Sequence, residues 1–228
     1  MNNFFPIPDA SSLIPHSFFL ISLFLFLFSF PVFAQDATQI LTQVKNNYEA
    51  HPNICARFTQ TFHWKLAEET QIVNGNICIK DGVKFKIETD NQIAITDGKT
   101  LWTLNKINKQ VIIDRAGGGS QENPLLKSFL QKYIENYVAK LVAAEKGDQG
   151  EIIYHLNLLA KSEDEFYQRI EIWIEKKSKS YFMKKIIQYD INGNETIYTI
   201  NDLNLQADIP DSMFKPAIPD GYEVIDLR

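Results

Sequence analysis

The 228-residue sequence lacks the short motifs that mark common enzyme classes. It contains no GxSxG nucleophile elbow, no HExxH zinc motif and no phosphate-binding loop. Its glycine run, Gly117–Gly119, has neither the spacing nor the strand–helix context of a phosphate cradle, so we interpret it as a flexible linker. The sequence therefore gives no support for a lipid hydrolase or a nucleotide-dependent enzyme, and we expect no enzymatic activity.

Histidine and excess positive charge are also scarce. The four histidines show no metal-ligand spacing, so no metal and no cofactor are expected; they are His16, His51, His63 and His155. Acidic residues outnumber basic ones by 28 to 23, which gives a net charge of −5. Nucleic-acid-binding proteins concentrate positive charge, so this balance argues against such a partner.

Cysteine is rare, with Cys55 and Cys78 as the two copies. If a strand around Phe58–Phe62 turns back through Lys65–Glu69 into a strand at Gln71–Lys80, the two cysteines lie nearly opposite each other. Two readings stay open at this point. The pair forms a disulfide in an oxidising compartment, or it consists of two buried free thiols.

The N-terminal segment carries an apolar run, Phe18–Phe30, followed by Pro31 and by small residues that end at Ala34. The run is shorter than the roughly 20 residues that a membrane span needs, so we expect a signal peptide over 1–34 that is cleaved after Ala34. The absence of Lys and Arg before the run is atypical, and a retained anchor is the alternative. Cleavage would leave 27 acids against 23 bases and no N-terminal cysteine for lipid attachment.

Most of the remaining chain, 35–228, alternates apolar and polar residues with the period of β-strands, and we expect it to form a single domain. The exceptions are a helix predicted over Asp36–Glu49 and a second helical pattern over Pro124–Ala144. Residues 116–145 are thus expected to form a linker and inserted helices that cap one side of a sheet. About ten short strands separated by turn signals predict a mainly β (α+β) fold, either a barrel or a strongly curved antiparallel sheet.

Short motifs in a fixed order extend this interpretation. They are Phe58-Thr59-Gln60, Asn74-Gly75-Asn76, Asp97–Trp102, Asn123-Pro124-Leu125, Phe214-Lys215-Pro216 and Pro219–Val224. In this order and spacing, residues 38–228 resemble the periplasmic outer-membrane lipoprotein carrier family (LolA-like). The motif at Asp97–Trp102, taken together with the closing motif at Pro219–Val224, is fairly specific.

The resemblance implies an open, incomplete antiparallel β-barrel of about 10–11 strands with an N-terminal helix and a helical lid. It implies a monomeric periplasmic carrier that binds the acyl chains of lipoproteins. The implied partners are acylated lipoproteins, an inner-membrane lipoprotein-releasing transporter and an outer-membrane receptor. The alternative is a non-catalytic lipid- or lipoprotein-binding sensor module of the same fold.

Strand alternation and the lid together give a set of candidate acyl-binding residues, and a phase error of one residue would invert any of the strands. The set is Ile77, Ile79, Phe85, Ile93, Ile95, Trp102, Leu125, Leu126, Phe129, Leu130, Ile170, Ile172 and Ile174.

One position departs from the family pattern. The family commonly has an arginine in a Phe-Arg-Trp run that holds the lid closed, and this chain has Phe85-Lys86-Ile87. Lysine offers a point charge rather than a planar fork of donors. Lys86 is therefore either a weaker lid latch or a surface lysine on the face opposite Phe85.

Overall fold

The computed structural model describes residues 36–116 and 127–228, with side chains in the second range from Leu130 onward. The chain divides after Ala34, and every described residue belongs to the unit Gln35–Arg228. The predicted signal peptide and most of the predicted glycine linker lie outside the described residues. In the described part, no helix is long and apolar enough to cross a membrane.

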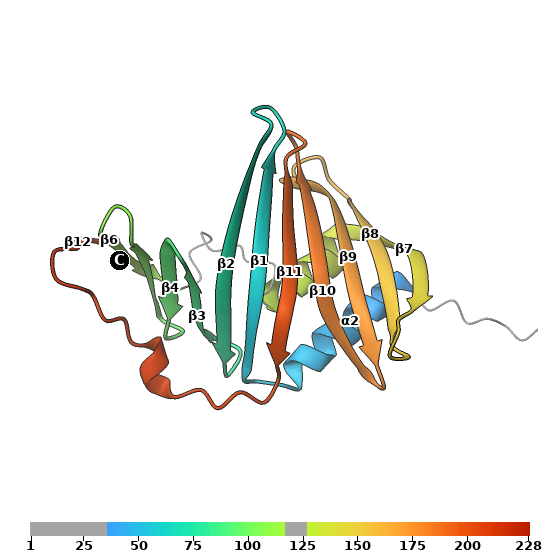
Figure 1. The fold of residues 1–228 in the computed structure, drawn as a ribbon, viewed down its shortest axis with the longest axis horizontal. Coiled ribbons are helices and arrows are strands. Elements are labelled where there is room, and N and C mark those ends of the chain that lie inside the picture. Colours follow the sequence, from blue (N-terminus) through green and yellow to red (C-terminus); the bar gives the residue numbers. More distant parts are fainter. Residues whose placement is uncertain (1–35, 117–126) are drawn as a thin grey trace, which may run out of the picture. The chain divides into compact units, whose positions relative to one another are not determined.

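Within these residues the secondary structure is one twelve-stranded sheet with two α-helices and a short 3-10 helix (Figure 1). In chain order the elements are α2 (Ala37–Glu49), β1 (Ile54–Trp64), β2 (Glu69–Lys80), β3 (Lys84–Thr89), β4 (Gln92–Thr96), β5 (Thr100–Asn105), β6 (Gln110–Arg115), α3 (Lys127–Asn136), β7 (Tyr137–Lys146), β8 (Ile152–Ala160), β9 (Tyr167–Lys177), β10 (Ser180–Asp190), β11 (Glu195–Asn204), η1 (Asp211–Phe214) and β12 (Glu223–Asp226).

The strands follow the order β12-β6-β5-β4-β3-β2-β1-β11-β10-β9-β8-β7. The pairing of β1 with β11 joins two antiparallel meanders, the first made of β1–β6 and the second of β7–β11, into one sheet, and β12 is added to β6 in parallel. β12 and β7 are the two ends of this order, so the sheet is open. The predicted open, mainly antiparallel sheet with an N-terminal helix is confirmed. β7 and β12 raise the number of strands above the predicted 10–11.

The helix predicted over Pro124–Ala144 is wrong in its second half. α3 ends at Asn136, and the chain continues directly into β7. The apolar residues of this stretch fit both periods, because Tyr137, Ala139 and Leu141 alternate while Val138 and Val142 fill the exposed face. Pairing with β8 along the whole strand decides between the two patterns, since tertiary contacts override local propensity.

The main core lies between the two helices and one face of the sheet. Asp36 caps α2 by accepting a hydrogen bond from the backbone N–H of Thr38, and Ile40, Leu41 and Val44 on the helix are fully buried. Burial of each of these side chains contributes about 1.5–3 kcal/mol. They meet the alternating apolar face of β8–β10, whose members include Leu156, Leu158, Ile170, Ile172, Ile174 and Ile186.

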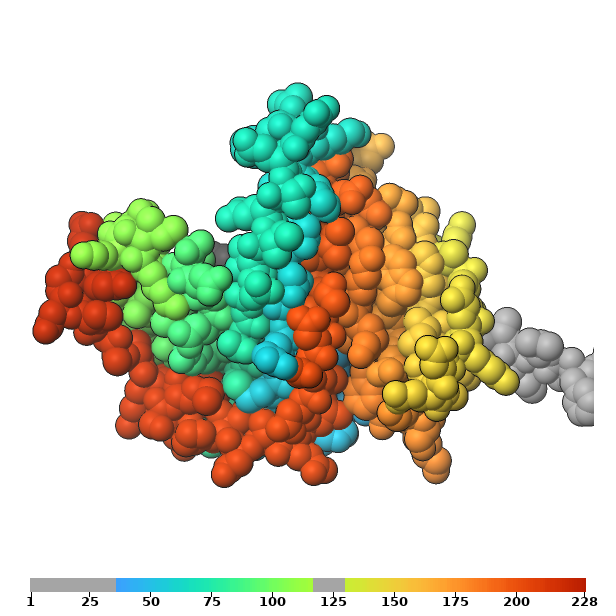
Figure 2. Space-filling view, viewed as in Figure 1, coloured from blue at the N-terminus to red at the C-terminus, as the bar shows by residue number. Residues whose placement is uncertain are grey.

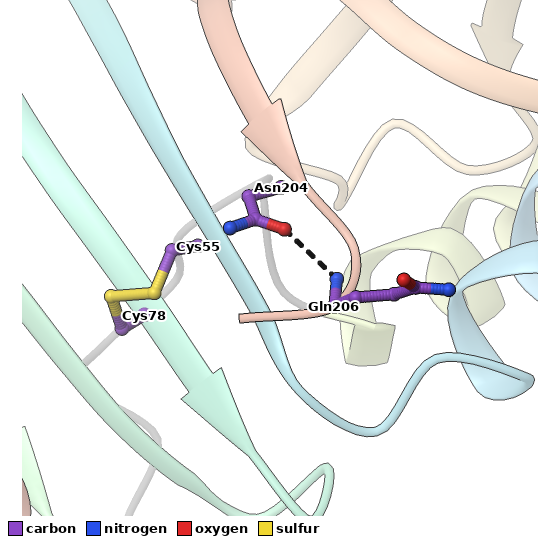
Figure 3. The surroundings of a disulfide bond; sticks show 4 residues. All are labelled: Cys55, Cys78, Asn204 and Gln206. Atoms are coloured by element: carbon purple, nitrogen blue, oxygen red, sulfur yellow. Dashed lines mark hydrogen bonds between the residues drawn. A yellow bond between two sulfur atoms is a disulfide. The ribbon is translucent and has the colours of Figure 1, made fainter. Parts of the chain in front are cut away.

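The hairpin of β1 and β2 has two features that fix its register. Cys55 lies directly opposite Cys78, with a Cα–Cα distance of 4.1 Å, and the two are joined by a disulfide (Figure 3). Farther along the hairpin, the ring of Phe58 covers Gly75. A Cβ atom at position 75 would lie 2.5 Å from Cζ of Phe58, so the close approach requires glycine.

The C-terminal segment covers the other face of the first meander. It begins after β11, where Asn204 accepts a hydrogen bond from the backbone N–H of Gln206 beside the disulfide (Figure 3). Ala207, Ile209 and Phe214 then pack against Ile95 in a second small core. Figures 1 and 2 show this segment running from β11 past the lower ends of the green strands to β12.

Candidate functional site

A cavity of about 680 Å³ lies between α2 and the face of the sheet that carries the main core. Its apolar lining comes from strands that are distant in sequence but adjacent in the sheet, namely β1, β2, β3, β10 and β11. These strands contribute Ile54, Ala56, Ile77, Ile79, Phe85, Met183, Ile200 and Leu203, and the β2–β3 turn adds Val83.

The helical wall of this cavity is fixed to β10 by two side chains of α2. Asn47 donates a hydrogen bond from Nδ2 to the carbonyl oxygen of Tyr181, at 3.1 Å. The backbone N–H of Met183 donates to the hydroxyl of Tyr48, at 3.2 Å. Burial raises the pKa of Tyr48 to about 12, so this residue stays a neutral phenol at the cavity wall.

α3 is held against the same face by a buried polar contact. Nε2 of Gln188 on β10 donates a hydrogen bond to the hydroxyl of Tyr133, at 2.9 Å. Burial raises the pKa of Tyr133 well above 10, and the residue packs edge-on against Tyr137 at the start of β7. Leu130, one turn earlier on α3, is fully buried in the core.

Polar and charged side chains gather at the rim of the cavity. α2 and the residues after it contribute Lys45, Glu49 and His51, the β2–β3 turn contributes Asp81, and the start of β3 contributes Lys84. Lys45 and Glu49 form an ion pair with an N–O distance of 2.8 Å. The cavity thus has an apolar floor and a charged rim.

Three of the predicted acyl-binding residues line this cavity together: Ile77, Ile79 and Phe85. Four others are fully buried in the adjoining core rather than at the cavity surface, namely Leu130, Ile170, Ile172 and Ile174. Leu125 and Leu126 lie outside the described residues, as does the side chain of Phe129.

The structure places Ile93, Ile95 and Trp102 on the opposite face of the sheet, against the C-terminal segment or beside it. Their assignment to the cavity is therefore wrong in phase. Ile95 pairs with Lys86 and Trp102, whereas Ala94 pairs with Ile87 on the cavity side. Ile93 and Ile95 share one face of β4, but the C-terminal segment buries that face, so alternation alone cannot show which side of the sheet faces the cavity.

Lys86 also lies on that opposite face. Its ammonium forms an ion pair with Glu88 at 2.8 Å, and its side chain is 29 % exposed. Phe85 points into the cavity, so the two neighbours have the arrangement that alternation predicts. We therefore leave Lys86 out of the proposed site.

Several cavity residues were missed from the sequence, including Ile54, Ala56, Tyr48, Met183, Ile200 and Leu203. A signal for two of them was present, because Ile54 and Ala56 alternate with Cys55 and Arg57 at the start of β1. Met183 and Leu203 carried no comparable signal, since their place in the cavity depends on the pairing of the two meanders.

The described lining residues contain polar groups but no serine or cysteine that could act as a nucleophile. His51 already uses Nδ1 in a 2.6 Å hydrogen bond with the carbonyl oxygen of Asn47. What the cavity can do is enclose an apolar chain. If a methylene takes about the 30 Å³ that a water molecule occupies in the liquid, the cavity has room for about 20 methylenes.

Comparison with known sequences identifies the family of this chain. Residues 51–217, more than half of the chain, match the family model described as outer membrane lipoprotein carrier protein LolA. An outer-membrane lipoprotein carrier protein of Chromohalobacter salexigens is 23 % identical over 200 residues, which cover 86 % of this chain and 90 % of that protein. An uncharacterised protein of Methanocaldococcus jannaschii is 24 % identical over 219 residues, 92 % of this chain, but the chain spans only 61 % of that relative's length.

Among solved structures, an uncharacterised conserved protein from Thermus thermophilus has a TM-score of 0.56 at 12 % identity, covering 83 % of this chain and 98 % of that one. A LolA superfamily protein from Nitrosomonas europaea has a TM-score of 0.43 at 14 % identity, covering 80 % and 99 %. At these identities the first likeness shows the fold alone. The match to the family model shows that the chain belongs to the outer membrane lipoprotein carrier protein LolA family.

Proposed function

We propose that the chain is a periplasmic carrier that binds the acyl chains of lipoproteins in the cavity between α2 and the sheet. The observation that carries the proposal is the cavity itself, with its apolar floor built from five strands and its volume of about 680 Å³. Membership of the lipoprotein carrier family supports the same function.

The physical need for such a carrier follows from the cost of exposing acyl chains to water. Transfer of each methylene out of water contributes about 0.8 kcal/mol, so a chain of about 16 carbons contributes roughly 12 kcal/mol. A protein needs no reactive group for this task. It needs an apolar surface of the right size that the chain can enter and leave.

In this proposal the carrier receives acylated lipoproteins from an inner-membrane lipoprotein-releasing transporter and passes them to an outer-membrane receptor. Transfer in one direction requires that the carrier bind the lipoprotein more weakly than the receptor does, since the difference between the two binding free energies drives the transfer. α3 and the segment before it, which includes Leu125, Leu126 and Phe129, would form a lid over the bound chain.

A release assay tests the proposal. Spheroplasts that contain newly made lipoproteins are incubated with the purified protein, and the soluble fraction is analysed for acylated lipoprotein bound to the carrier. We expect soluble 1:1 complexes that depend on cellular energy. A folded protein that releases no lipoprotein would exclude the carrier function, and binding of lipid without release would favour the sensor alternative.

A further inference from the structure

The twelve-stranded sheet ends in two edge strands that differ in length and character. β12 has four residues, Glu223–Asp226, with a carboxylate at each end. β7 has ten residues, Tyr137–Lys146, and contains no proline. Within the described residues β7 pairs with β8 alone, so its other side has no neighbouring strand. Proteins usually keep edge strands short or charged, because a long unpaired edge attracts another strand. β12 is protected in this way, and β7 is not.

The solvent-facing side of β7 is also partly apolar. Val138 is 47 % exposed and Val142 is 56 % exposed. Val138 lies directly opposite Leu159 of β8, which is itself 40 % exposed, so the two form an apolar pair at the margin of the sheet. The alternate residues Ala139 and Leu141 pack against the main core instead. A second strand that covers this margin would remove apolar surface from water.

A β-bulge in β7 determines which of its residues can lie opposite each other in a symmetric pair. Val142 is the extra residue, because the pairing with β8 shifts between Leu141 and Ala143. Lys140 faces away from the core before the bulge and Glu145 does so after it, so the outward positions change from even to odd residue numbers. A second, antiparallel copy of β7 carries the same bulge, and it must place outward residues opposite outward residues.

One register meets this condition and also pairs the charges. If Lys140 lies opposite Glu145 of a second copy, two-fold symmetry also places Glu145 opposite Lys140 of that copy. The core-facing residues then match as well, with Leu141 opposite Ala144. The other register that matches the faces puts Lys140 opposite Ala143 and pairs no charges. Within the described part of the chain, Lys140 and Glu145 have no ion-pair partner of their own, so both charges are available.

We propose that β7 is a self-association edge, through which two copies of this protein form a symmetric antiparallel dimer. The two sheets become continuous across the Lys140–Glu145 pairs, with both Val142 side chains next to the two-fold axis. The contact uses the same edge of both copies, so association stops at the dimer. β7 contributes none of the described lining residues of the cavity, so this inference does not depend on the proposed acyl binding. It differs from the monomer that the family resemblance implies.

The test is sedimentation velocity over a concentration series of the purified protein, in low-salt and in high-salt buffer. We expect a monomer–dimer equilibrium that shifts to monomer on dilution, because one strand pair buries less surface than a stable interface does. High salt should weaken the dimer by screening the charge pairs. A protein that stays monomeric at every concentration, or that forms larger oligomers, would overturn the inference.

Charge reversal then tests the register. Lys140→Glu puts two glutamates opposite each other at both symmetric positions and should weaken association by about tenfold. Lys140→Glu combined with Glu145→Lys exchanges the charges and should restore the dimer. The matched control is Lys215→Glu in the C-terminal segment, an exposed lysine whose reversal changes the net charge equally and should leave the dimer unchanged.

Circular dichroism shows whether each variant keeps its fold. If Lys140→Glu unfolds the protein, Glu145→Lys alone creates the corresponding repulsion between lysines and should weaken the dimer to a similar extent. A folded single variant that dimerises as the wild type does, or a double variant that stays monomeric, would contradict the proposed register and edge.

Discussion

Replacement of Ala56 by phenylalanine should fill part of the cavity and leave the packing of the rest of the core unchanged. Ala56 is 9 % exposed, lies in the cavity floor and pairs with Ile77 on β2 and Leu203 on β11. The added ring takes the room of about three methylenes, so at about 0.8 kcal/mol for each one the bound chain loses about 2.4 kcal/mol. This loss corresponds to roughly 50-fold weaker binding.

The assay is equilibrium binding of monopalmitoylglycerol to the wild type and to the Ala56→Phe variant, with urea unfolding as a check of the fold. The matched control is Ala67→Phe in the exposed β1–β2 turn, which adds the same ring far from the cavity lining. If overpacking unfolds the first variant, Ala56→Leu makes a smaller change of the same kind. Unchanged affinity in a folded Ala56→Phe variant would refute the assignment of the cavity as the acyl site.

Three further predictions concern the frame that holds the cavity. Reduction of the Cys55–Cys78 disulfide, which spans 23 residues, should lower the free energy of unfolding by about 3 kcal/mol. The measurement is urea unfolding with and without reductant, and identical midpoints would show that the bond adds no stability. Gly75→Ala should destabilise the protein by about 1–3 kcal/mol, because its Cβ would lie 2.5 Å from the ring of Phe58, and Phe58→Leu should remove most of that penalty in a double-mutant cycle. Hydrogen bonds from Lys80 and Lys84 hold the pKa of Asp211 below its usual 3.8, so its carboxylate stabilises the fold above about pH 4, and this contribution is lost as the pH falls through the lower pKa. Asp211→Asn should therefore flatten the acid side of the curve of unfolding free energy against pH. An unchanged acid side would contradict the role of the ion pairs.

The sequence was sufficient to predict the elements whose two faces differ clearly. α2 follows from Ile40, Leu41 and Val44 on one face, and the strands of the second meander follow from strict alternation such as that of Ile170 and Ile172. The direct opposition of Cys55 and Cys78 also follows from the hairpin turn between them. In these segments local pattern and tertiary burial agree.

The errors fall on strands whose second face is also apolar or is covered by a distant segment, because the local pattern is then ambiguous. The sequence of β7 predicts a helix because Val138 and Val142 add apolar residues on its exposed face. Ile95 was placed on the wrong side because Ala207, Ile209 and Phe214, more than 100 residues later in the chain, cover that side of β4. No window of local sequence contains such a contact.

The composition of the cavity depends on long-range pairing for the same reason. Ile77, Ile79 and Phe85 come from one hairpin and its next strand, and these were predicted. Met183 and Leu203 reach the cavity through the pairing of β1 with β11 and of β11 with β10, which connects the two meanders.

The most direct test of the central claim is a chain-length series of monoacylglycerols, from 10 to 18 carbons, titrated into the purified protein by calorimetry. An apolar cavity with room for about 20 methylenes predicts a 1:1 complex whose affinity rises about fourfold with each methylene, at about 0.8 kcal/mol per group. An affinity that does not change with chain length would contradict the claim that the cavity encloses an acyl chain.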